Sequence, residues 1–148
     1  MKVPKPMIRQ YQPEDTDAVI AVWQRANAYA HPFLPEDFVV QGTNDMRNIY
    51  LPNAETWVLE HDGALAGFIS MVGTEIGGLF LDPSLHGKGY GRAMTDHVAK
   101  SHGPLTVEVF EQNAVGRPFY DRYGFVETGR YEHEPTGEVV IKMALKAS

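Results

Sequence analysis

The stretch of the sequence with the clearest chemical potential is residues 86–92, which read His-Gly-Lys-Gly-Tyr-Gly-Arg. Three glycines stand at alternate positions, and basic residues stand beside them. The apolar run 79–81 leads into this loop through Asp82-Pro83, and a helical pattern follows it. Glycines leave backbone N–H groups unhindered, and the N-terminus of a helix carries a positive partial charge. The stretch therefore predicts a binding site for a phosphate group where a strand gives way to a helix.

Two common phosphate-binding loops do not match this stretch. A nucleotide-binding P-loop needs Ser or Thr directly after Gly-Lys to hold magnesium, but Gly87-Lys88 is followed by Gly89. A dinucleotide-binding fingerprint needs a third glycine three places after its second, and Arg92 occupies that position. A glycine-rich turn without a ligand is the remaining alternative, but so many glycines cost more chain entropy than a turn requires. The pattern therefore favours another phosphate-containing ligand.

Length and composition indicate one domain, residues 1–148, with a net charge of −6. The excess of acidic residues argues against a general nucleic-acid-binding protein, while the basic segment 86–102 points to a small anionic ligand. No apolar run approaches the roughly 20 residues that span a bilayer, and no apolar signal core follows the basic N-terminus. Cysteine is absent, and the six histidines lack metal-ligand spacing. We therefore expect a cytoplasmic protein without a bound metal, which binds neither nucleic acid nor membrane.

Hydrophobic periodicity and turn residues predict the elements that position the glycine loop. Strands are expected over residues 7–11, 56–60, 64–72, 76–81, 105–109, 125–134 and 139–145. Helices are expected from about 13 to 30, after residue 35, from the glycine loop to about 101, and from 113 to 123. The second of these helical stretches is weaker and is expected to end before Pro52, because proline disfavours a helix interior.

The order of these elements predicts the fold class. Hairpins in the first half and strand–helix alternation in the second half indicate an α/β (α+β) protein. We expect a mixed central sheet of about seven strands, flanked by about four helices. Strands 76–81 and 105–109 are joined by a helix, so they are expected to be parallel neighbours.

Two motifs resemble those of one enzyme superfamily. Residues 79–91 resemble the acetyl-CoA-binding signature of the GNAT N-acetyltransferases, which is Arg or Gln, two residues, Gly, one residue, then Gly or Ala. Gly89 and Gly91 match this signature, while His86 replaces the usual Arg or Gln. Residues 113–125 are similar to the family's Asn-x-x-Ala-x-x-Phe-Tyr-x-x-x-Gly-Phe, with glycine in place of the alanine. The family's separation and order of elements also match, over essentially the whole chain.

This resemblance implies the GNAT-like fold, with acetyl-CoA as the acetyl donor. It further implies a gap between strands 76–81 and 105–109, where the pantetheine arm of the cofactor inserts. The residues expected to contact the cofactor are Phe80, Leu81, His86, Gly87, Lys88, Gly89, Tyr90, Gly91, Arg92, Asn113 and Tyr120. Backbone amides would hold the pyrophosphate, whereas Lys88 and Arg92 either add charge or are solvated.

The resemblance also suggests catalytic residues. Tyr120 is expected to protonate the leaving thiolate, since a phenol with a pKa of roughly 10 is a reasonable proton donor. Glu75 occupies a position where relatives place a general base, although it equally fits a solvated turn carboxylate; Glu108 and Glu111 are further candidates. Pro118 lies inside the last helix, so that helix is expected to start late or to kink.

The acceptor is expected to be a primary amine of a small molecule or a peptide. His31 and Phe33 are the expected substrate contacts, because relatives use the region after the first helix. A hinge between helices is the alternative interpretation of this region. Two other functions stay open, namely a non-catalytic acyl-CoA-binding regulatory domain and a thioester hydrolase. Relatives also leave open a monomer or a homodimer that pairs through the C-terminal strands.

Overall fold

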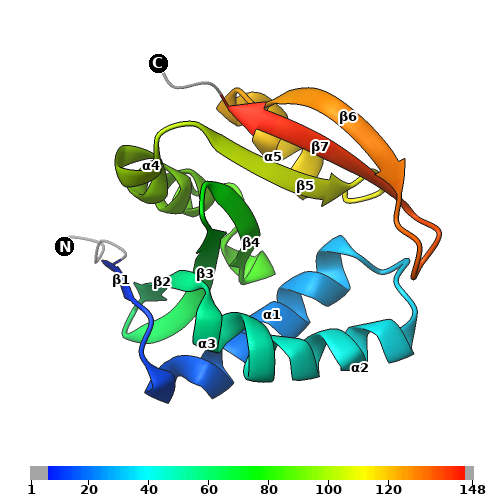
Figure 1. The fold of residues 1–148 in the computed structure, drawn as a ribbon. Coiled ribbons are helices and arrows are strands. Elements are labelled where there is room, and N and C mark those ends of the chain that lie inside the picture. Colours follow the sequence, from blue (N-terminus) through cyan, green and yellow to red (C-terminus); the bar gives the residue numbers. More distant parts are fainter. Residues whose placement is uncertain (1–6, 146–148) are drawn as a thin grey trace.

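The computed structural model describes residues 7–145 of the chain. Seven strands form one mixed sheet in the order β1-β2-β3-β4-β5-β7-β6, with helices against it (Figure 1). The strands are β1 (Met7–Gln10), β2 (Glu55–His61), β3 (Ala64–Val72), β4 (Glu75–Leu81), β5 (Leu105–Phe110), β6 (Val126–Glu132) and β7 (Val139–Leu145). The helices are α1 (Thr16–Ala30), α2 (Glu36–Asp45), α3 (Leu51–Asn53), α4 (Tyr90–His102) and α5 (Gly116–Tyr123). The mixed seven-stranded sheet that the sequence predicted is thereby confirmed.

The pairing of β4 with β5 is parallel, as predicted, and it is short. Only two residue pairs join the strands, Glu75 with Thr106 and Ile76 with Val107. Gly77 follows directly and has no partner in β3, which makes it a β-bulge. A bulge bends its strand and increases the local twist, so β4 diverges from β5 beyond this residue. The gap that the family resemblance implies between these two strands is present.

Two buried clusters lie on opposite faces of the sheet. The cluster on the α1 face contains Val19, Ile20, Val22, Met46, Leu51, Val58 and Phe68. The cluster on the other face joins α4 and α5 to alternate residues of β5 and includes Met94, Val98, Leu105, Val107, Val109 and Phe125. Phe80 packs against the first cluster, whereas Leu79 packs against the second. The divergent end of β4 therefore presents side chains to both faces beside the gap.

The prediction that the second helical stretch ends before Pro52 is wrong. Helix α2 continues through a π-helical turn, Met46–Tyr50, into α3, which contains Pro52. The wider π-helical turn directly before Pro52 shifts the backbone hydrogen bonds to i→i−5, as in the bond from the Leu51 amide to the Met46 carbonyl, and so accommodates a residue without an N–H. The side chain of Asn53 also donates to the carbonyl of Ile49 at 2.6 Å, which satisfies one of the carbonyl groups of the wider turn.

Helix α5 starts at Gly116, three residues after Asn113. This late start is the outcome predicted from Pro118, which occupies an early position in the helix. Helix α4 runs to His102 and ends at Gly103, whose φ of +72° favours glycine. Among the helices of residues 7–145, none combines the length and the apolar character that crossing a bilayer requires.

Candidate active site

The three glycines at positions 87, 89 and 91 are required for different structural reasons. Gly87 and Gly89 adopt φ angles of +80° and +89°, in the left-handed region where residues with a Cβ are strained. Gly91 lies inside α4, where a Cβ would come within 3.2 Å of the Phe119 ring on α5. Two glycines therefore shape the loop, and the third lets the two helices pack closely.

The backbone amides of this loop are free to bind a ligand. Gly89 is the N-cap of α4, and its carbonyl accepts the first helical hydrogen bond, from the amide of Ala93 at 3.0 Å. No hydrogen bond among the described residues uses the amides of residues 87–92. The first helical amides have no partner within the helix, and the helix dipole adds positive potential at this end. The loop thus has the donors that a phosphate group requires.

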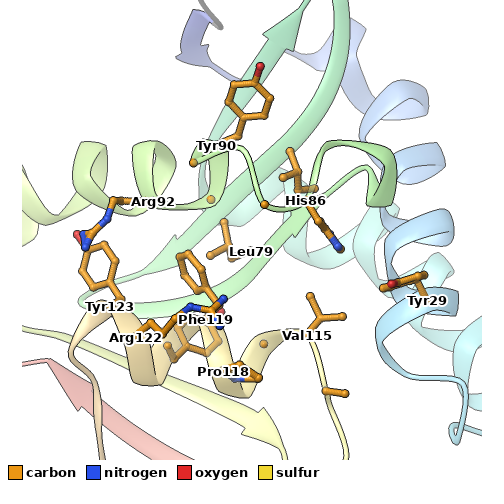
Figure 2. A pocket seen from close by; sticks show the side chains of 17 residues that line it. Tyr29, Leu79, His86, Tyr90, Arg92, Val115, Pro118, Phe119, Arg122 and Tyr123 are labelled. Atoms are coloured by element: carbon orange, nitrogen blue, oxygen red, sulfur yellow. The ribbon is translucent and has the colours of Figure 1, made fainter.

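A cavity of about 660 Å³ lies beside the loop, between α4 and α5 (Figure 2). We call it the first cavity; it is lined by Tyr29, Leu79, Leu81, His86, Gly87, Gly89, Tyr90, Gly91, Arg92, Ala114, Val115, Gly116, Pro118, Phe119, Tyr120, Arg122 and Tyr123. Arg92 and Arg122 bring positive charge to this lining, and none of the described residues that form it is a carboxylate. Lys88, an expected cofactor contact, is exposed and does not line the cavity. The first cavity therefore suits an anionic ligand with apolar portions.

Aromatic rings hold two of the polar side chains that border this cavity (Figure 2). The guanidinium of Arg92 lies 5.0 Å from the centre of the Tyr123 ring, at the distance of a cation–π contact. The imidazole of His86 packs edge-on against Tyr29, with 5.5 Å between ring centres. Tyr29 follows no motif, and sequence reasoning did not identify it as a site residue. His86 thus offers an aromatic wall where the family signature has Arg or Gln.

A second cavity, of about 220 Å³, lies where β4 and β5 diverge. It is lined by Ala26, Ala30, His31, Ile76, Gly77, Gly78, Leu79, Phe80, Leu81, His86, Val107, Glu108, Val109, Phe110, Asn113, Val115, Gly116 and Tyr120. It shares Leu79, Leu81, His86, Val115, Gly116 and Tyr120 with the first cavity. The two cavities therefore adjoin one another at the gap in the sheet.

Tyr120 stands at the junction of the two cavities. Its side chain is only 6% exposed, and it lines both of them. Burial raises the pKa of its phenol above the ordinary value of 10.0. Within residues 7–145, no hydrogen bond occupies its hydroxyl, and no fully buried polar side-chain atom lacks a partner. Tyr120 is thus a protonated donor that faces the cavities rather than the protein.

The candidate bases differ in their positions relative to the cavities. Glu75 is exposed at the start of β4 and lines neither cavity. The carboxylate of Glu111 accepts from Arg130 at 2.8 Å and lies outside both cavities as well. Of the three candidate bases, Glu108 is therefore the one that lines a cavity.

Within residues 7–145, no three His, Asp or Glu side chains gather closely enough to hold a metal ion.

His31 and Asn113 lie in the second cavity and bond to each other. The Nδ2 atom of Asn113 lies 3.1 Å from Nε2 of His31, and Nδ1 of His31 lies 2.7 Å from Oδ1 of Asn27. The Oδ1 atom of Asn113 accepts from the amides of Val115 and Gly116 at 3.0 and 2.7 Å. Burial lowers the pKa of His31 from 6.5 to about 4, so its ring is neutral at neutral pH.

Phe33 lies outside both cavities but supports the second one. Its ring packs edge-on against His31 and Phe110, with 5.7 Å between ring centres in each pair. Phe33 therefore packs against His31, which lines the second cavity, but does not line the cavity itself. Asn27 was not identified from the sequence, although a polar residue after Ala26 in the apolar pattern of α1 is a usable indication.

The sequence matches the family model of an acetyltransferase (GNAT) domain over residues 18–147. The chain belongs to the GNAT acetyltransferase family. It is 33% identical over 120 residues to the peptidyl-lysine N-acetyltransferase YiaC of Escherichia coli (strain K12), covering 80% of this chain and 82% of that protein. The peptidyl-lysine N-acetyltransferase YjaB of the same bacterium is 33% identical over 133 residues, covering 88% and 89%. This GNAT protein is therefore an N-acetyltransferase, as its motifs predicted.

Solved structures of GNAT proteins share the fold. The solution structure of apo-form YjaB from Escherichia coli superposes with a TM-score of 0.87 at 28% identity, covering 98% of this chain and all of that one. The PaiA N-acetyltransferase from Thermoplasma acidophilum, solved in complex with coenzyme A, gives a TM-score of 0.73 at 19% identity. That match covers 98% of this chain and 100% of that one, and it shows the common fold alone.

Proposed function

We propose that this GNAT N-acetyltransferase transfers the acetyl group of acetyl-CoA to the side-chain amine of a lysine in a peptide or protein. The observation that carries this proposal is the pair of adjoining cavities at the gap between β4 and β5. The first cavity offers free amides and two arginines, which suit the phosphates of a CoA molecule. The second offers Glu108 and aromatic rings, which suit an ammonium on an alkyl chain. The names of the relatives YiaC and YjaB support a lysine acceptor.

The donor side is assigned to the loop and to β4. Acetyl-CoA supplies an activated thioester, so the protein has chiefly to position and polarise it. The amides of residues 87–92 and the side chains of Arg92 and Arg122 bind the phosphates. Beyond Gly77, β4 has no strand partner on its β5 side within residues 7–145, so the backbone of Phe80 and Leu81 is available to pair with the pantetheine arm. An amide of this segment donates to the thioester oxygen as negative charge develops there.

The proton transfers are assigned to Glu108 and Tyr120. An ammonium must lose a proton before its nitrogen can attack, and Glu108 accepts that proton directly or through a water molecule. The nitrogen then bonds to the acetyl carbon and the bond from that carbon to sulfur breaks, while the nitrogen gives up its second proton to solvent, from which the Tyr120 phenol is restored after the transfer. Tyr120 donates its phenolic proton to the departing sulfur, because burial keeps the phenol protonated until charge develops beside it.

A cysteine-free chain allows a direct test of this proposal. Because the protein contributes no thiol, released CoA can be followed continuously with a thiol-reactive dye. The substrate is a peptide with a blocked N-terminus and a single lysine; the control peptide carries arginine in place of that lysine. We expect CoA release from acetyl-CoA in the presence of the lysine peptide but not of the arginine peptide. Mass spectrometry should place one acetyl group on the lysine side chain.

Four other outcomes would contradict all or part of this proposal. CoA release that is equally fast without any amine would indicate a thioester hydrolase. Binding of acetyl-CoA in calorimetry without turnover on a broad amine panel would indicate a non-catalytic binding domain. Turnover restricted to small amines would retain acetyl transfer but reject the peptide lysine. Absence of acetyl-CoA binding at millimolar ligand would overturn the donor assignment itself.

A further inference from the structure

We propose that Asn27 and His31 are positioning residues for acetyl transfer, which hold the side chain of Asn113 and, through it, the start of the helix that carries Tyr120. This inference rests on the proposed role of Tyr120. It concerns three polar side chains from α1, from the segment after α1, and from the β5–α5 connection. None of the acetyl-donor contacts assigned above includes Asn27 or His31.

The direction of each hydrogen bond follows from the atoms involved. Oδ1 of Asn113 accepts the amides of Val115 and Gly116, so Nδ2 of Asn113 is the atom that faces His31. An amide nitrogen only donates, and Nε2 of His31 must therefore accept. The proton of the neutral ring then resides on Nδ1, which donates to Oδ1 of Asn27 at 2.7 Å. Asn27 thus selects the tautomer that can hold Asn113.

The space around Asn113 shows how closely this side chain is fitted to α5. A Cβ on Gly116 would lie 2.7 Å from Nδ2 of Asn113, nearer than real Cβ atoms approach other heavy atoms. The glycine at this position, where the family motif has alanine, therefore leaves room for the amide group. Gly116 is the first residue of α5, and Tyr120 follows it by four residues on the same helix face. An error in the placement of Asn113 is transmitted directly to the helix that aims Tyr120.

Burial makes the three side chains depend on one another. Asn27 is 4% exposed and Asn113 is 8% exposed. Every fully buried polar side-chain atom of the described residues has a hydrogen-bond partner. Loss of the acceptor on His31 would leave the Asn113 donor without a partner in a site that water reaches poorly. The amide would then turn toward another acceptor and release the start of α5.

The ligand-free protein permits a direct test of the hydrogen-bond chain. Long-range ¹H–¹⁵N spectra of histidine side chains distinguish a ring protonated on Nδ1 from one protonated on Nε2. We expect His31 to show the Nδ1–H form in the wild type and a smaller fraction of it in Asn27→Ala, where Asn113 alone favours this form. An Nε2–H form in the wild-type protein would overturn the inference, whatever the activity of the enzyme.

A matched pair of His31 variants separates positioning from packing. His31→Gln keeps an acceptor near the position of Nε2, whereas His31→Phe keeps the aromatic ring and its packing but provides no acceptor. We expect kcat for the lysine peptide to fall about tenfold in His31→Phe and Asn27→Ala, and to stay within about threefold of the wild type in His31→Gln. The KM for acetyl-CoA should stay within twofold in all three, because the amides of residues 87–92 lie outside the hydrogen-bond chain.

The outcomes of this test are distinguishable from failure of the proposed function. A wild-type enzyme that acetylates no amine would remove the proposed function, and the tautomer measurement would still decide the hydrogen-bond chain. Normal kcat in His31→Phe together with reduced kcat in His31→Gln would show that ring packing matters instead. If all three variants lost the same amount of kcat and the same amount of thermal stability, the role of these residues would be purely structural and the inference would be overturned.

Discussion

Glu75 and Glu108 lie on adjacent parallel strands, yet of the two only Glu108 lines a cavity of the candidate active site. Glu75 pairs with Thr106 at the point where β4 and β5 still lie side by side. Glu108 comes two residues later on β5, after the bulge at Gly77 has turned β4 away. The length of the parallel pairing therefore determines which of the two carboxylates lines the second cavity.

We predict that Glu108→Gln lowers kcat for the lysine peptide by about 100-fold at pH 7, the usual size of a general-base contribution. The loss should shrink as the pH approaches the lysine pKa of about 10.4, because more of the amine is then already neutral. Glu75→Gln is the matched control and should retain wild-type kcat, since Glu75 lines neither cavity. A pH–rate profile of the three proteins checks this prediction; the reverse ranking of the two variants would reassign the base to Glu75.

We predict that Tyr120→Phe lowers kcat by about 100-fold and leaves acetyl-CoA affinity within threefold of the wild type. The hydroxyl has no partner within residues 7–145, so its removal should change the free energy of unfolding by less than about 1 kcal/mol. Tyr123→Phe is a suitable control because Tyr123 lies on the same helix and lines only the first cavity. Steady-state kinetics and calorimetry provide both readouts. Unchanged turnover in Tyr120→Phe would exclude the phenol as the proton donor.

We predict that Gly89→Ala weakens acetyl-CoA binding at least tenfold, because an alanine strains the left-handed backbone that presents the loop amides. The control is Gly63→Ala, in the turn between β2 and β3, where φ is +78° and a Cβ would meet nothing within 4 Å. Both substitutions should cost about 1–2 kcal/mol of stability. The two variants should therefore differ in acetyl-CoA affinity, measured by calorimetry, but not in the free energy of unfolding, measured with denaturant. Equal affinities would show that the loop does not bind the donor.

Much of the fold was predictable because its determinants are local. Turn residues and alternating apolar residues identified the strands, and the spacing of glycines identified the loop before α4. The segment around Pro52 was misplaced because a π-helical turn, Met46–Tyr50, accommodates this proline, and the sequence alone does not distinguish it from a proline that ends a helix. The family motifs led to Tyr120 and Asn113, which the fold places beside the cavities.

The remaining parts of the site depend on contacts between distant segments. His31 and Asn113 lie 82 residues apart in sequence, and no periodicity or spacing relates them. In the sequence, Asn27 is recognisable only as a polar residue in an otherwise apolar stretch of α1. The structure explains it by the hydrogen bond to His31. Whether Glu75 or Glu108 lines the cavity depends on where β4 and β5 stop pairing. The sequence of either strand alone does not predict that point.

The last prediction concerns the pH dependence of stability. His31 has a pKa of about 4 in the folded protein, below its ordinary value of 6.5, because burial disfavours the charged ring. Between these two values the unfolded chain binds a proton that the folded protein does not, so folding becomes less favourable as the pH falls. Linkage gives a loss of about 2 kcal/mol at pH 5 relative to pH 7.

The same prediction can be isolated from other titrating groups with His31→Gln, which removes the ionisable ring and keeps an acceptor for Asn113. Urea unfolding at pH 7 and pH 5 should show that the wild type loses about 2 kcal/mol more than this variant. Asn27→Asp provides a second check: a carboxylate beside Nδ1 favours the charged ring and should raise the His31 pKa, so the loss in this variant should be smaller than in the wild type. Equal pH dependence in the wild type and His31→Gln would mean that His31 titrates normally and that its ring is not held neutral by burial.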